Sequence, residues 1–137
     1  MLAKRVILIF VSFAMLECSA RPRLVISLVV ENKTDLLLEN VIVPIGIFKN
    51  GSTMYPQQSA QHSAINEHIP DIFNVSWQVA GKTYSETLRV TEKMRSSAYR
   101  MVRETSSASS DQRFQSLYFV VTFEAADSVK VEFRLTN

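Results

Sequence analysis

The strongest constraint on the fold is a period of two in the positions of apolar residues, which recurs in several short segments. In residues 72–79 one side of the alternation is entirely apolar: Phe73, Val75, Trp77 and Val79. A period of two puts alternate side chains on opposite faces of a β-strand, so we expect these four to point into a core, with Trp77 buried. Apolar residues also recur with a period of two in residues 24–30, 83–90, 117–123 and 129–135. The chain is therefore predicted to be mainly β.

The remaining strands are predicted from turn signals. Residues 40–49 are apolar on both faces and lead into Asn50-Gly51, a pair that favours a type I′ hairpin turn. A short return strand over residues 53–55 then ends at Pro56. The polar stretch from Pro56 to Pro70 is interpreted as a long loop.

One segment has helical rather than strand periodicity. Between Glu92 and Glu104 the apolar residues recur at helical spacing: Met94, Ala98, Met101 and Val102. Thr91 is the expected N-cap, and a serine-rich loop, Ser106 to Asp111, follows. We therefore predict an antiparallel two-layer β-sandwich with one amphipathic helix inserted between late strands.

The N-terminus has the features of a secretory signal peptide. Lys4 and Arg5 precede an apolar run from Val6 to Leu16, which is too short to span a bilayer. We expect residues 1–20 to be the signal and residues 21–137 to form one exported domain. Three outcomes stay open: cleavage after Ala20, lipidation of Cys18 as in outer-membrane lipoproteins, or an uncleaved anchor.

The exported part has no cysteine of its own, because Cys18 is the only one. Small secreted eukaryotic domains usually carry disulfides, so we expect a bacterial periplasmic protein. Three glycosylation sequons, at Asn32, Asn50 and Asn74, keep a eukaryotic origin open as the alternative. The charge of residues 21–137 is nearly balanced, which argues against nucleic acid as a partner. Membrane contact is expected only through a lipid or an uncleaved signal.

Catalytic chemistry is not apparent in the sequence. His62, Glu67, His68 and Asp71 are close in sequence but lack the spacing of a metal site, so we interpret them as part of a solvated loop. The exported part has no nucleophile elbow and no phosphate-binding glycine loop. We predict a protein without catalytic residues, metal or cofactor that is not an enzyme.

A binding surface is expected on the polar loop and on the helix, because recognition residues concentrate on elements outside a rigid sheet scaffold. Aromatic residues and arginine dominate protein interfaces. The candidate contact residues are tyrosines, histidines and arginines in or next to these segments: Tyr55, His62, His68, Arg95, Tyr99, Arg100 and Arg103.

Several segments resemble small exported bacterial proteins, many of them lipoproteins, that act as immunity partners of toxic type VI secretion effectors. They are Val29 to Asp35, Phe48 to Gly51, Ile69 to Trp77 and Gly81 to Tyr84. Glu17 departs from a lipoprotein signal, and the paired cysteines of some of these proteins are missing. The resemblance implies that the protein binds a toxic effector enzyme and occludes it. The alternative is a structural or assembly protein of the bacterial envelope.

Overall fold

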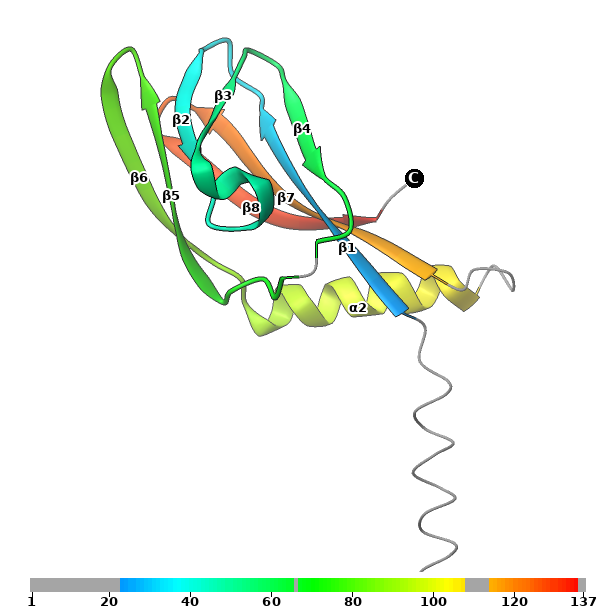
Figure 1. Ribbon diagram of the computed structural model, residues 1–137. Coiled ribbons are helices and arrows are strands. Elements are labelled where there is room, and N and C mark those ends of the chain that lie inside the picture. The colour runs from blue at the N-terminus through cyan, green and yellow to red at the C-terminus, as the bar shows by residue number, and fades with distance from the viewer. Residues whose placement is uncertain (1–22, 66, 108–113, 136–137) are drawn as a thin grey trace, which may run out of the picture.

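The part of the protein that the structure describes is built from two four-stranded sheets and one α-helix (Figure 1). The computed structural model describes residues 23–65, 67–107 and 114–135. One sheet has the order β4-β1-β7-β8 and the other the order β3-β2-β5-β6. The elements are β1 (Arg23–Asn32), β2 (Leu38–Ile42), a 3₁₀ helix η1 (Gly46–Asn50), β3 (Ser52–Met54), β4 (Ser59–His62), β5 (Ile72–Val79), β6 (Lys82–Arg89), α2 (Glu92–Ser107), β7 (Phe114–Ala125) and β8 (Ser128–Leu135). The predicted mainly β fold with one helix between late strands is confirmed.

The core between the sheets centres on Trp77, which is 1% exposed. Its indole Nε1–H donates to the carbonyl of Ala126 at 2.8 Å, so the one polar group of the ring is satisfied. Tyr84 stacks on the indole and Phe123 meets it edge-on. The predicted burial of Trp77 is confirmed, together with that of Phe73 and Val75, whereas Val79 is only half-buried.

The middle of one sheet differs from the expected antiparallel arrangement. β1 and β7 pair in parallel over their shared length, from Arg23 opposite Phe114 to Asn32 opposite Phe123. The other strand pairs of both sheets are antiparallel within the described residues. A hairpin requires antiparallel neighbours, but β1 and β7 are joined through the whole second sheet and α2, so no hairpin fixes their relative direction.

The predicted strand over residues 40–49 is wrong in its second half. β2 ends at Ile42 and the chain continues as η1, which buries Phe48. Gly46 has φ +59°, and a Cβ at this position would lie 2.3 Å from Nδ1 of His62. Gly51 has φ 87° and ψ 144°, which is not the type I′ conformation expected from Asn50-Gly51. The apolar residues of this segment therefore belong partly to the end of β2 and partly to the helical turn η1, which buries Phe48 in the core.

The predicted loop between Pro56 and Pro70 contains a strand. β4 pairs antiparallel with β1, from Leu28 opposite His62 to Glu31 opposite Ser59. Its sequence is polar because it is a short edge strand, in which Ala60 packs against the core. Main-chain pairing with β1, rather than side-chain burial, holds it in place.

The helix follows the prediction closely. The backbone N–H of Met94 donates to Oγ1 of Thr91 at 3.2 Å, which confirms the N-cap. Ala98 and Val102 are buried, while Met94 and Met101 are half-buried. α2 continues to Ser107, so the first two residues of the predicted Ser106–Asp111 loop are helical, and the rest of that loop lies outside the described residues.

Candidate binding surface

Arg95 joins the helix to the segment that precedes β5. Its Nη2 donates to the carbonyl of Ile69 at 2.6 Å and to Oδ1 of Asp71 at 2.9 Å. The carbonyl of Asp71 in turn accepts the N–H of Val90, just before α2. The Arg95 side chain is only 18% exposed, so these bonds are shielded from water on one side. Residues 67–71 are therefore held against the start of α2. We define the helix-end surface as residues 67–71 together with Arg95, Tyr99, Arg100 and Arg103 of the helix.

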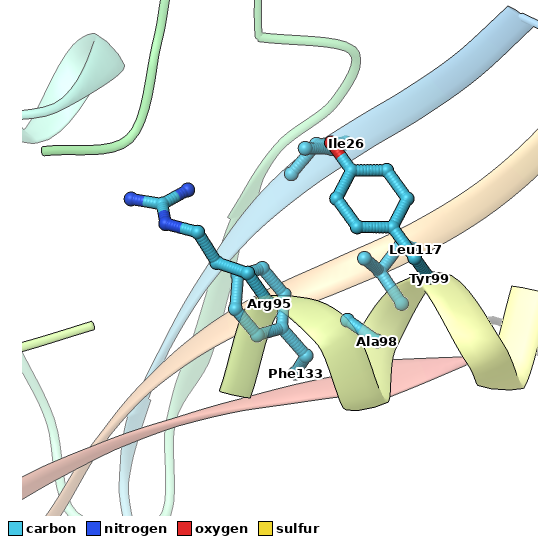
Figure 2. Close-up of a pocket in the computed structure, with 6 residues that line it drawn as sticks. All are labelled: Ile26, Arg95, Ala98, Tyr99, Leu117 and Phe133. Carbon is cyan, nitrogen blue, oxygen red and sulfur yellow. The ribbon is translucent and has the colours of Figure 1, made fainter. Parts of the chain in front are cut away.

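A shallow hollow lies beneath this surface, between α2 and the strands (Figure 2). Ile26, Leu117 and Phe133 line it from β1, β7 and β8. The helix contributes Ala98, Tyr99 and the stem of Arg95, and Figure 2 shows the Tyr99 ring reaching from α2 toward Ile26. Tyr99 nevertheless remains 55% exposed, so it presents an aromatic surface on a rigid support.

Arg100 and Arg103 are exposed on the side of α2 that faces away from the sheets. Arg103 lies beside both Tyr99 and Arg100 on the helix surface, because it is four residues from the first and three from the second. His68 is also exposed and directly precedes Ile69, whose carbonyl Arg95 binds. Five of the seven predicted contact residues therefore lie on α2 or on the segment that Arg95 binds: Arg95, Tyr99, Arg100 and Arg103 on the helix, and His68 on the segment.

The other two predicted contact residues lie elsewhere. Tyr55 is 62% exposed, but its carbonyl accepts from the Asn32 side chain at the end of β1, whereas Ile26 under α2 lies near the start of that strand. Nδ1 of His62 accepts the N–H of Ile47 at 3.2 Å and packs against Gly46. His62 therefore holds η1 against β4, and Tyr55 belongs to the opposite end of the sandwich.

The two acidic residues of the predicted loop, Glu67 and Asp71, pair with different basic side chains. Glu67 pairs with Lys49 of η1 at 2.8 Å, and the hydrogen bond from this lysine lowers the pKa of the carboxyl. Asp71 is held by Arg95. Among the described residues no group of three or more histidine, cysteine, aspartate or glutamate side chains lies close enough to hold a metal ion.

The sequence analysis missed a network on the outer face of the β4-β1-β7-β8 sheet. Arg134 donates to Glu31 at 2.9 Å across the sheet and also bonds Glu132. The hydrogen bond with Glu31 is the main cause of the raised pKa of Arg134. A signal was present in the sequence: Lys130, Glu132 and Arg134 alternate in charge on one face of the last strand.

Asn32, one of the three sequon asparagines, has a structural role. It is 1% exposed, and its Nδ2 donates to the carbonyls of Leu36, Met54 and Tyr55. Its Oδ1 accepts from the backbone and hydroxyl of Thr34. A glycan on this nitrogen is incompatible with these bonds.

No protein-family model matches the sequence, and neither a curated protein nor a solved structure matches it significantly. The resemblance to immunity proteins therefore stays a prediction. The predicted signal peptide and Cys18 lie outside the described residues. Within the described ranges, no helix combines the length and apolar character needed to cross a membrane.

Proposed function

We propose that the protein is an exported binding protein of the bacterial periplasm, which acts as an immunity protein by occluding a toxic secreted effector. The helix-end surface is the proposed contact region. The observation that carries the proposal is the Arg95 bridge, because it fixes residues 67–71 to α2 beside the exposed Tyr99.

Three properties of this surface support a protein partner. Tyr99 offers rigid aromatic area, and the exposed Arg100 and Arg103 offer charged groups that form bidentate bonds with carboxylates. The support beneath them is fixed before any partner arrives, which reduces the entropy lost on binding. An occluding protein needs such a surface and no reactive group of its own.

A growth assay tests this proposal. The assay takes the product of the gene next to this one as the effector to be tested, and produces it in the periplasm of a bacterial host together with the full chain. We expect the wild-type chain to restore growth and to co-purify with the toxin. Tyr99→Ala, and separately Arg100→Glu with Arg103→Glu, should each weaken the complex at least tenfold, as expected for central interface residues.

The matched control reverses two basic residues elsewhere. Lys82→Glu with Arg89→Glu makes the same charge change on β6, where both residues are exposed, and affinity should stay within about twofold. Circular dichroism checks that every variant is folded. If the helix variants bind as tightly as wild type, the helix-end surface is not the contact region. If the chain co-purifies with envelope components and leaves the toxin active, the assembly role replaces the immunity role.

A further inference from the structure

The two sheets end in four edge strands of unequal length. β3 and β4 have three and four residues, whereas β6 and β8 have eight each. A long edge strand exposes unpaired main-chain groups and can pair with another chain unless something blocks it. β6 and β8 differ in this respect.

β6 is blocked by a charge directed inward. Glu86 is the register partner of Val75, which is fully buried, so the carboxyl faces the inside of the sandwich. Oε2 of Glu86 accepts the backbone N–H of Val129 at 3.3 Å. One side chain therefore protects the β6 edge and caps the beginning of β8.

Beyond Val129, none of the residues that the structure describes pairs with β8 on the side away from β7, so its edge is open there. Because the N–H of Val129 points away from β7, the main-chain groups of every second residue after it, Val131, Phe133 and Leu135, point the same way. The three side chains are apolar and only half-buried. Residues 129–135 include no proline, and their charged residues, Lys130, Glu132 and Arg134, lie on the outer face.

The helix leaves room beside this edge. A hollow between α2 and β8 is lined by Lys93, Met94, Ser97 and Met101 from the helix and by Val131, Glu132 and Phe133 from the strand. The apolar residues of the edge therefore continue into a mainly apolar groove that also carries Lys93 and Glu132, as expected of a surface that a second polypeptide covers.

We propose that β8 pairs antiparallel with β8 of a second copy of this chain, about a two-fold axis at Phe133. The two four-stranded sheets would join into one of eight strands. Val131 lies opposite Leu135 of the second copy, and Phe133 lies opposite its own equivalent. The pairing uses the outward N–H and C=O groups of all three residues and makes about six main-chain hydrogen bonds.

Charge complementarity favours a second copy as the occupant. In this register Glu132 lies opposite Arg134 of the second copy, and the two-fold axis creates this pair twice. The pairs extend the network in which Arg134 already contacts Glu31. A register centred on Val131 would need the N–H of Val129, which Glu86 already binds. The cap at Glu86 therefore selects the register centred on Phe133.

The dimer leaves the helix-end surface accessible. The side of α2 that carries Met94, Ser97 and Met101 faces β8, whereas Tyr99 and Arg95 border the hollow that reaches β1. The two surfaces occupy different sides of one helix. A dimer can therefore present two helix-end surfaces, and this inference goes beyond the proposed function.

Complementary charge reversals test the interface. The full chain and its variants are purified in a density-matched mild detergent and followed by sedimentation velocity over a wide concentration range. Wild type should change from one to two copies. Glu132→Arg alone and Arg134→Glu alone should each weaken self-association at least tenfold, because like charges then face each other. Mixing the two variants should restore dimers, because both cross-strand pairs become opposite again.

Hydrogen exchange of the wild type provides a readout that does not depend on folded variants. The amides of Val131, Phe133 and Leu135 should exchange at least tenfold more slowly at dimer concentrations, while those of β6 serve as the control and stay constant. A monomer at every concentration overturns the proposal. So does a dimer that leaves the β8 amides unprotected, or one that the charge reversals do not affect. Protection of the β8 amides only by a different protein also overturns the second copy as occupant.

Discussion

The described residues form two hydrophobic clusters that are built differently. The larger one lies between the sheets and buries large rings such as Trp77, Phe119 and Phe123 almost completely. The smaller one lies under α2, where Ala98, Val102 and Leu117 are buried but Met101, Phe133 and Leu135 keep part of their surface exposed. The first cluster is closed by two rigid sheets, and the second by a single helix with a hollow on each side.

This difference separates stability from recognition. Burial of apolar area is the main source of stability, so the cluster between the sheets should dominate the free energy of unfolding. The cluster under α2 leaves aromatic and apolar area at the surface, which is the property of a binding region. We therefore expect substitutions in the two clusters to have unequal consequences.

The largest effect should come from removing the ring at the centre of the sandwich. Trp77→Ala should cost about 3–5 kcal/mol, a large part of the total stability of a domain this size. The loss comprises the buried ring and its contacts with Tyr84 and Phe123. Denaturant unfolding measures it. A variant as stable as wild type would mean that the sandwich does not depend on this cluster.

A matched pair of valines compares the two clusters directly. Val75 is fully buried between the sheets, and Val102 is 6% exposed under α2. Val75→Ala should cost about 2–3 kcal/mol and Val102→Ala about 1 kcal/mol, because a helix can settle onto its support more easily than two sheets can approach. Chemical denaturation of both variants gives the two values. Equal costs would contradict the comparison.

The sequence predicted the buried residues of the strands and of the helix better than it predicted the contacts at the surface. Alternation placed Phe73, Val75 and Trp77 correctly because burial on one face of a strand selects apolar residues at every second position. The apolar residues of α2 were predicted equally well, because they recur at helical spacing. Both patterns are local, so a single sequence contains them.

The features that the sequence did not reveal depend on contacts between distant residues. β4 is polar and is held by pairing with β1, while Gly46 and His62 meet only in the folded chain. Arg95 bonds to Ile69 and Asp71, which lie 26 and 24 positions before it in the chain, and no rule of sequence spacing predicts such contacts. The position of Tyr55 at the other end of the sandwich from α2 was not predictable for the same reason.

A smaller effect is expected at the junction between loop and helix. Arg95→Ala removes the bonds to Ile69 and Asp71 and should lower global stability by only about 1 kcal/mol, because Asp71 is mostly exposed. Locally, residues 67–71 should become more sensitive to protease. Limited proteolysis with mass spectrometry measures this, with Arg100→Ala as the control. Unchanged cleavage would show that the bridge does not hold the segment.

The smallest effect is expected from acid, at the ion pair between Glu67 and Lys49 that also holds residues 67–71. The hydrogen bond from Lys49 lowers the pKa of Glu67 from its ordinary value of 4.5. A carboxyl with a lowered pKa contributes stability above the unfolded pKa and loses it as the pH falls through the folded pKa. In an NMR titration, the carboxyl of Glu67 should therefore take up its proton at a pH below 4.5, and Lys49→Ala should move that midpoint up toward the ordinary value. A midpoint that Lys49→Ala leaves unchanged would assign the lowered pKa to another group.

Native-state hydrogen exchange tests the division between the two clusters most directly. The account predicts that the amides of Ala98 to Val102 exchange through a partial opening with a lower free energy than global unfolding, whereas the amides of Val75, Trp77 and Phe119 exchange only when the whole domain unfolds. Added denaturant should bring the two sets together. If both sets show one free energy and one denaturant dependence from the start, the helix is an integral part of the sandwich and the division between stability and recognition is wrong.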